Sequence, residues 1–176
     1  MFSLGWFASG NGELMKALHK HHPISVIIAD RKCKSIDWAE DNNIPWGVFS
    51  DKKRFSIDAM TVLDLYKIDY AFLTFASILR GEMINKYWKR LVNFHPAPLP
   101  EFPGLGVMEK AYSSGYGGFT YHYVDTGLDT GEIIKRNVLP IGNLSMEEYN
   151  KSIFNHAVET GIEILNDLEV KHARHE

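Results

Sequence analysis

Residues 70–94 read YAFLTFASILRGEMINKYWKRLVNF, and this stretch decides the fold. The apolar runs at 70–75 and 90–94 are typical of strands, and the amphipathic segment 81–88 between them is typical of a helix. A strand, a helix and a second strand in this order form the unit that joins parallel strands of one sheet.

The same alternation runs through the first two-thirds of the chain. Several of the apolar runs are apolar on both faces, as expected for strands that helices cover on both sides. The sequence therefore predicts an α/β fold with a Rossmann-like, mostly parallel sheet and helices on both faces. Further strands are expected at 2–7, 25–29 and 46–49, and further helices at 13–20, 34–42, 56–67 and 106–114.

The pattern changes after residue 115. Residues 119–125 alternate in polarity and 131–141 follow, so we expect antiparallel edge strands near the C-terminal end. Ser145 and Glu148 form a capping box that opens a final helix. We expect a single domain over residues 1–167 and a polar tail over 168–176, of which KHARHE at 171–176 is frayed.

The composition is ordinary for a globular chain, with 45% hydrophobic and 23% charged residues. The net charge of -3 gives no electrostatic attraction to nucleic acid or anionic membranes. No apolar run approaches the roughly 20 residues that a bilayer-spanning helix needs. Cys33 is the only cysteine, which excludes an internal disulfide and fits a reducing compartment. We expect a cytoplasmic monomer or homodimer without nucleic-acid or membrane partners.

Asn93 and His95 lie two residues apart at the end of the predicted strand 90–94, so both side chains point to one face. Ligands of open parallel sheets bind beyond the carboxyl ends of the strands. An amide and an imidazole there could stabilise an oxygen that gains negative charge. The prolines at 96, 98, 100 and 103 stiffen the following loop. A purely structural role for the pair remains an alternative.

Residues 124–134 read VDTGLDTGEII, a Gly-rich segment with two acidic residues. Asp129, if it meets His95, would favour the imidazolium form and could collect a proton from a nucleophile. The alternative is a turn in which Asp side chains bind their own backbone.

The segments LVNFHPAPLPEFPG and DTGLDTG, about 30 residues apart, resemble the signature of the 10-formyltetrahydrofolate-dependent formyltransferase family. The resemblance extends over roughly residues 1–167 and is closest to single-domain members of the glycinamide ribonucleotide formyltransferase type. It implies one catalytic domain with 10-formyltetrahydrofolate as the formyl donor and no metal. It also implies a cis peptide bond at Leu99–Pro100.

The resemblance implies a role for each matching residue. Asn93 and a protonated His95 would stabilise the oxyanion that forms when an amine attacks the formyl carbon. Asp129 would hold His95 charged and help to remove the amine proton. The folate would contact Phe75, Ile78, Leu79, Ile84, Leu91, Val124, Asp125, Thr126 and Gly127.

The match is weaker where ribonucleotide formyltransferases bind the substrate phosphate. That segment reads Gly10, Asn11, Gly12 and Glu13 here, and Glu13 would repel a phosphate at the first turn of a helix. Ser77 and Gly106 replace an arginine and a histidine of the family pattern. These substitutions indicate a different small amine as acceptor, although phosphate binding at Gly10–Gly12 remains an alternative.

Four functions therefore remain open. The first is formyl transfer to a small primary amine, and the second is glycinamide ribonucleotide formylation. The third is hydrolysis to formate, and the fourth is a folate-binding protein without activity. His122 could line the site or pack structurally, and the cluster of His19, His21 and His22 suits a helix end better than a metal.

Overall fold

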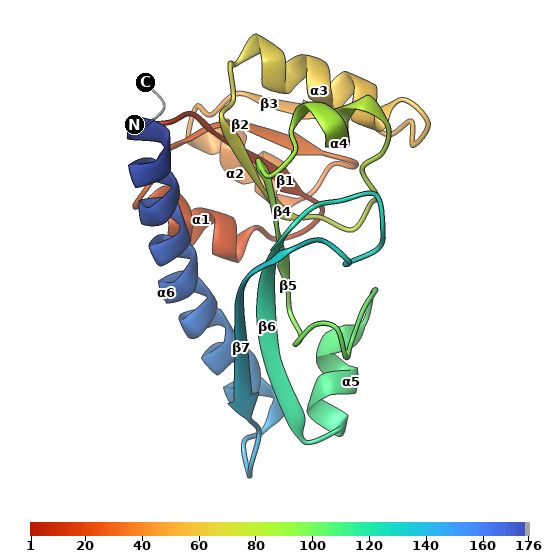
Figure 1. Cartoon of the computed structure of the whole chain (residues 1–176), viewed down its shortest axis with the longest axis vertical. Coiled ribbons are helices and arrows are strands. Elements are labelled where there is room, and N and C mark those ends of the chain that lie inside the picture. The colour runs from red at the N-terminus through yellow and green to blue at the C-terminus, as the bar shows by residue number, and fades with distance from the viewer. Residues whose placement is uncertain (175–176) are drawn as a thin grey trace.

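The computed structural model describes residues 1–174 and contains seven strands and six helices, arranged as Figure 1 shows. The first two-thirds of the chain alternate strand and helix as the sequence predicts. In chain order the elements are β1 Leu4–Ala8, α1 Glu13–His19, β2 Ile24–Ala29, α2 Lys34–Asp41, β3 Trp46–Val48, α3 Phe55–Leu65, β4 Tyr70–Thr74, α4 Glu82–Lys86, β5 Leu91–His95, α5 Val107–Ser113, β6 Tyr116–Tyr123, β7 Ile133–Pro140 and α6 Met146–Ala173.

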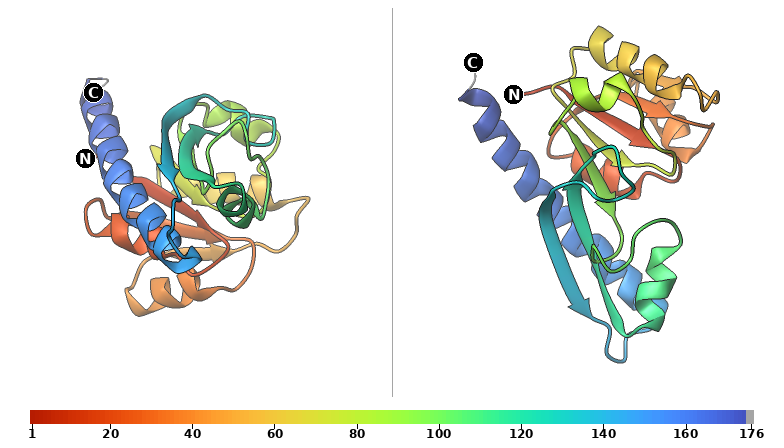
Figure 2. Two further views of the ribbon diagram at one scale, coloured as in Figure 1. Left: turned by 90° about the horizontal axis from the view of Figure 1, so that it is seen from below. Right: turned by 45° about the vertical axis from the view of Figure 1, so that its right-hand side comes forward.

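All seven strands form one sheet in the order β3-β2-β1-β4-β5-β6-β7. The strands from β3 to β5 pair in parallel, whereas β6 pairs antiparallel with both β5 and β7. The predicted α/β class, with antiparallel strands at one edge, is therefore confirmed. The two views in Figure 2 show the β6–β7 hairpin extending away from the parallel part of the sheet.

Helices cover both faces of the sheet, and successive strand residues serve opposite faces. Trp6 of β1 packs in a core with α1, α2 and α6, whereas its neighbour Phe7 packs in a second core with α3 and α4. Both side chains have no exposed surface. This layering leaves the carboxyl ends of β1, β4 and β5 free of covering helices.

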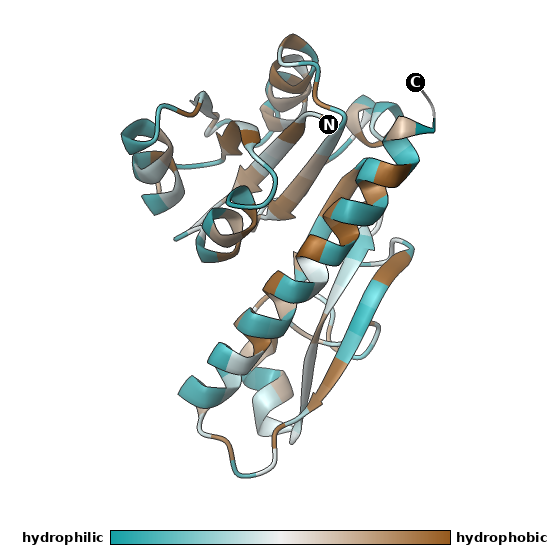
Figure 3. Cartoon of the chain, turned by 90° about the vertical axis from the view of Figure 1, so that its left-hand side faces the viewer, coloured by the Kyte–Doolittle hydropathy of each residue, from teal (hydrophilic) through white to brown (hydrophobic). Residues whose placement is uncertain are grey.

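Helix α6 runs along the whole molecule and mixes hydrophobic and hydrophilic positions, as Figure 3 shows. It begins with the expected capping box, in which Ser145 Oγ accepts from the Glu148 backbone N–H. The expectation of fraying from residue 171 is wrong for residues 171–173, because α6 continues to Ala173. The physical reason is that Leu168 is only 2% exposed and Glu169 binds the N-terminal ammonium at 3.0 Å. Residues 175 and 176 of the expected tail lie outside the described part.

Replacing Leu168 by Ala should therefore lower the free energy of unfolding by about 2–4 kcal/mol, because it leaves a cavity under the helix. Urea unfolding would measure this change. Val170→Ala is the matched control, since Val170 is 51% exposed and its replacement should shift the midpoint little. Equal, small effects of the two replacements would mean that the end of α6 is not held against the core.

Candidate active site

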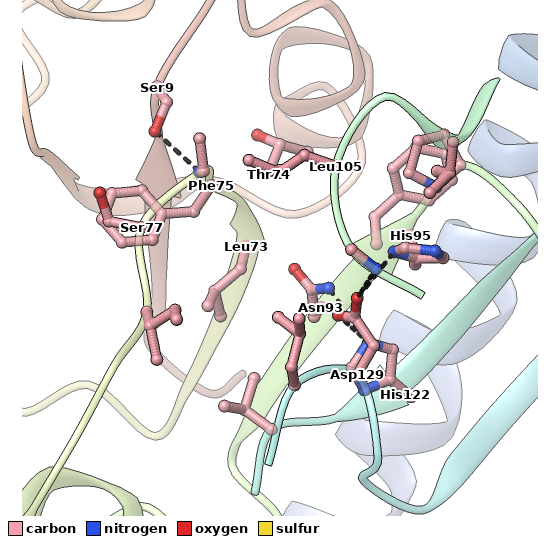
Figure 4. Close-up of a pocket in the computed structure, with 18 of the residues that line it drawn as sticks. Ser9, Leu73, Thr74, Phe75, Ser77, Asn93, His95, Leu105, His122 and Asp129 are labelled. Atoms are coloured by element: carbon pink, nitrogen blue, oxygen red, sulfur yellow. Dashed lines mark hydrogen bonds and ion pairs between the residues drawn. The ribbon is translucent and has the colours of Figure 1, made fainter. Parts of the chain in front are cut away.

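A cavity of about 930 Å³ lies beyond the carboxyl ends of the central strands. Figure 4 shows Asn93, His95, His122 and Asp129 gathered on one side of it, with Ser9 and Ser77 on the other. The first group comes from β5, β6 and the loop before β7, and the two serines follow β1 and β4. Side chains from segments far apart in sequence thus meet where an open parallel sheet binds ligands.

Asn93 and His95 lie at the carboxyl end of β5, and both residues line the cavity. Their antiparallel partners on β6 are His122 and Thr120, respectively. Thr120 Oγ1 donates to the carbonyl of Ala97 and accepts from the Leu99 N–H, both at 3.0 Å. The loop after β5 is thereby fastened to the sheet, and its Leu99–Pro100 peptide bond is cis as expected.

Asp129 lies between the two histidines. Its Oδ2 atom is 3.5 Å from His95 Nδ1 and accepts from the Gly104 N–H at 2.8 Å. Its Oδ1 atom is 3.6 Å from His122 Nε2. The backbone of Asp129 has a φ of 54°, in the left-handed region that Asp tolerates better than most residues. The side chains of His95 and Asp129 are only 4% and 11% exposed, so water screens their interaction weakly.

His122 orients Asn93. Its Nδ1 atom lies 2.8 Å from the carbonyl oxygen of Tyr123, so Nδ1 carries the hydrogen of the neutral ring. Nε2 is then an acceptor, and it receives a hydrogen bond from Asn93 Nδ2 at 3.0 Å. This contact fixes which end of the amide is the NH₂ group and leaves its second hydrogen for a ligand.

Burial lowers the pKa of the His95 imidazole, and the Phe102 carbonyl and the Asp129 carboxylate offset this only in part. The expectation that Asp129 keeps His95 charged at neutral pH is therefore wrong for the free protein. Burial also raises the pKa of Asp129, but its polar contacts, among them the hydrogen bond from the Gly104 N–H, outweigh it. The net pKa of Asp129 lies below its ordinary value. At neutral pH the pair is an imidazole beside a carboxylate, which is an arrangement that accepts a proton.

We expect His95 to titrate below the ordinary histidine pKa of 6.5, as followed by NMR of its ring nitrogens. In Asp129→Asn the titration should move lower still, because the carboxylate that favours the charged form is gone. An upward shift of the His95 titration in Asp129→Asn would contradict the described contact.

Most of the residues predicted to bind folate meet at the cavity. The structure does not bring Ile84, Leu91 or Thr126 to it. Ile84 of α4 and Leu91 of β5 are each 1% exposed, and both pack in the core that includes α3 and α4. Thr126 is exposed and does not line the cavity. The predicted residues that do line the cavity are Phe75, Ile78, Leu79, Val124, Asp125 and Gly127.

Of the four residues predicted at the acceptor side, only Gly10 lines the cavity, and Asn11, Gly12 and Glu13 do not. Gly12 caps α1 with a φ of 71°, and a Cβ there would lie 2.5 Å from Ser35 Oγ, so the position requires glycine. Glu13 is 65% exposed and pairs with Lys16 at 2.9 Å.

Residues 6–165 match the family model described as "Formyl transferase". The chain belongs to the formyl transferase family. The match extends from β1 into α6 and includes every residue of the polar cluster, so the resemblance noted in the sequence is confirmed.

The chain is also similar to named formyltransferases. Phosphoribosylglycinamide formyltransferase of Bacillus subtilis is 29% identical over 151 residues, and the match covers 77% of each protein. The chloroplastic enzyme of that name from Arabidopsis thaliana is 29% identical over 188 residues, covering 94% of this chain but 64% of the relative. The crystal structure of phosphoribosylglycinamide formyltransferase from Streptococcus pneumoniae gives a TM-score of 0.88 at 28% identity, covering 96% of this chain and 99% of that one.

Two absences concern possible cofactors and membranes. Among residues 1–174, no group of three or more His, Cys, Asp and Glu side chains could hold a metal ion. His22 stacks on Phe2 at 4.0 Å and His19 Nδ1 accepts from the Ile24 N–H, so these two histidines serve structural contacts. In the same part of the chain, every helix is too short or too polar to cross a membrane.

Sequence reasoning left the role of His122 undecided, and its contacts with Asn93 and Tyr123 are visible only once β5 and β6 are paired. We expect His122→Phe, which keeps a ring but removes the acceptor, to lower kcat roughly tenfold. The reason is that a lost hydrogen bond costs about 1–1.5 kcal/mol and frees the amide to rotate. Steady-state kinetics should show little change in KM, and the effect should vanish when Asn93 is already Ala. Full additivity of the two replacements would contradict a positioning role.

Proposed function

We propose that this chain transfers the formyl group of 10-formyltetrahydrofolate to a primary amine of a small acceptor. The observation that carries the proposal is the cluster of Asn93, His95 and Asp129 at one side of a deep cavity, in a chain of the formyl transferase family. The match covers only 64% and 60% of the length of the two chloroplastic relatives. The activity and the substrates of this chain are therefore proposals.

The cavity is suited to a folate. Its volume of about 930 Å³ is that of a pocket for a drug-sized ligand, and its walls include Phe75, Leu79 and Val124. Asp125 and Gly127 of the following loop line the cavity beside these apolar side chains. Apolar walls with a few fixed polar groups are what a flat heteroaromatic ring with polar edges requires.

When bound, 10-formyltetrahydrofolate supplies a formyl carbon attached to a nitrogen. Asn93 stabilises the formyl oxygen as the acceptor nitrogen attacks that carbon, because the oxygen then gains negative charge. The second amide hydrogen of Asn93 is the donor, and the His122 contact fixes its direction. A single fixed donor of this kind is typically worth about 2.7–4 kcal/mol of barrier.

His95 and Asp129 carry out the proton transfers of the reaction. The acceptor nitrogen must lose one proton after the new carbon–nitrogen bond forms, and the donor nitrogen must gain one as its bond to the formyl carbon breaks. His95 accepts the first proton at Nδ1, where Asp129 lies 3.5 Å away and stabilises the resulting imidazolium. The same pair returns a proton to the donor nitrogen, so one proton is moved and none is consumed.

The names of the relatives favour one specific acceptor, and glycinamide ribonucleotide is therefore the second candidate. In that case the chain would formylate this ribonucleotide in purine synthesis. Hydrolysis to formate and folate binding without turnover remain distinguishable alternatives. We also propose that the protein acts in the cytoplasm as a monomer or homodimer, which the single cysteine and the modest net charge favour.

Transfer of a ¹³C-labelled formyl group tests the proposal. Purified protein is incubated with labelled 10-formyltetrahydrofolate and a set of primary amines, and ¹³C NMR follows the label. We expect the label to appear in an N-formyl amine, at a rate that depends on the acceptor concentration. Label in formate, independent of any amine, would identify a hydrolase, and label that stays on the donor would identify a folate-binding protein.

A further inference from the structure

The charge of the catalytic cavity limits the kind of amine that can enter it. Among residues 1–174, no lysine or arginine lines this cavity. Three carboxyl side chains line it, from Glu109, Asp125 and Asp129. Asp125 is satisfied locally, since it accepts from the Gly127 N–H and the Thr130 hydroxyl. Asp129 belongs to the proton-accepting pair described above. The lining therefore offers negative charge and no compensating cation.

A fourth carboxylate lies beneath the cavity, at the end opposite Asn93. The side chain of Asp30 is 8% exposed and accepts from Ser9 Oγ at 3.1 Å and from Ser77 Oγ at 2.5 Å. Ser9 Oγ in turn accepts from the Ala76 N–H at 3.0 Å. Both serine hydroxyls that line the cavity thus donate their hydrogens to Asp30. These two hydroxyls are therefore not available as donors to a phosphate.

The cations near this end are already paired. Arg31 binds Asp30 with two nitrogens, Nε at 2.9 Å and Nη2 at 2.7 Å, and lines a neighbouring cavity. Lys16 pairs with Glu13 at the first turn of α1. A phosphate bound here would have to break one of these pairs, which leaves a carboxylate without its partner.

Glu109 is the free acidic group of the cavity. It lies in the first turn of α5, is exposed, and makes no ion pair with any of residues 1–174. A carboxylate in this position attracts an ammonium group and accepts hydrogen bonds from hydroxyl groups. It repels a dianionic phosphate, and water screens this repulsion only partly inside a cavity.

We propose that the acceptor amine carries no phosphate and presents hydroxyl or ammonium groups to Glu109, which lines the cavity. This inference rests on the proposed formyl transfer in the same cavity. It makes the substrate class an uncharged or cationic, donor-rich small amine, such as an amino sugar or a diamine. Selection arises both from attraction to Glu109 and from a lining that, among residues 1–174, contains no lysine or arginine side chain to neutralise a phosphate.

The test compares two acceptors with the same reacting amine, glycinamide ribonucleotide and its phosphate-free ribonucleoside. Glucosamine and 1,3-diaminopropane separate hydroxyl from ammonium recognition. With the wild-type protein we expect kcat/KM for the ribonucleoside to exceed that for the ribonucleotide at least about tenfold, a difference of roughly 1.4 kcal/mol. Glu109→Lys should reverse the preference by tenfold or more, and Glu109→Gln should reduce it. Glu159→Lys, an equal charge change on the exposed surface of α6, should leave the ratio unchanged.

Three outcomes would overturn the inference. A wild-type preference for the ribonucleotide would refute the acceptor class while leaving formyl transfer intact. A substrate ratio that Glu109→Lys and Glu159→Lys change equally would also refute it, because Glu109 would then have no local role. If none of the amines is formylated, the proposed formyl transfer itself fails, and the inference fails with it.

Discussion

Asn93→Ala should lower kcat for formyl transfer by about a hundredfold to a thousandfold. The direction of the amide is fixed by a neighbour, His122 Nε2 at 3.0 Å. Removing a preorganised donor to a developing oxyanion costs about 2.7–4 kcal/mol in barrier, and each 1.36 kcal/mol is tenfold in rate. Affinity for the folate should change little, since the apolar walls of the cavity are untouched.

The matched control is Asn150→Ala, an exposed asparagine on α6. Both proteins should give the same circular dichroism spectrum and nearly the same thermal midpoint. Turnover by Asn93→Ala within about threefold of the wild type would remove the amide from the mechanism. A folate affinity that falls in step with kcat would mean that Asn93 serves binding rather than the reaction.

Asp129→Asn is expected to lower kcat at least about a hundredfold. The replacement keeps an oxygen that can accept from the Gly104 N–H, so the loop retains its 2.8 Å contact. It removes the negative charge that lies 3.5 Å from His95 Nδ1 and stabilises the protonated imidazole. General acid–base assistance is typically worth about 10²–10⁴-fold, and the pair supplies it in this account.

Asp167→Asn, on the exposed surface of α6, controls for the loss of one negative charge. It should have wild-type kinetics. If Asp129→Asn retained near-normal turnover with a lowered His95 pKa, the carboxylate would be shown to tune the histidine without taking part in proton transfer. A loss of turnover accompanied by loss of the fold would be recognised by circular dichroism.

The parts of the fold that follow from periodicity were predictable from the sequence. The apolar runs that became β1, β2, β4 and β5 and the alternating run that became β6 each specify a strand by local pattern. Asn93 and His95 were identifiable because a spacing of two places side chains on one face of a strand. Asp129 was a candidate because it lies in the acidic, Gly-rich segment 124–134, but loop residues carry no periodic signal, so a turn remained the alternative until the family resemblance favoured a catalytic role.

Other features depend on contacts between distant segments. The side chains of Ile84 and Leu91 are buried in the core because of packing contacts that the sequence pattern alone does not reveal. The sign of the His95 pKa shift follows from burial, which outweighs the attraction of Asp129. Asp30, Ser9 and Ser77 meet only because β1, β2 and β4 end side by side. The tail is helical because Leu168 is buried in the core, although several of its sequence neighbours are polar.

A crystal structure with an unreactive analogue of 10-formyltetrahydrofolate in the cavity is the most direct test of the account. We predict that the formyl oxygen lies about 2.7–3.1 Å from Asn93 Nδ2, with the formyl carbon open to the end of the cavity that holds Glu109. A formyl group directed away from Asn93, or a folate bound in the neighbouring cavity beside Arg31, would contradict it.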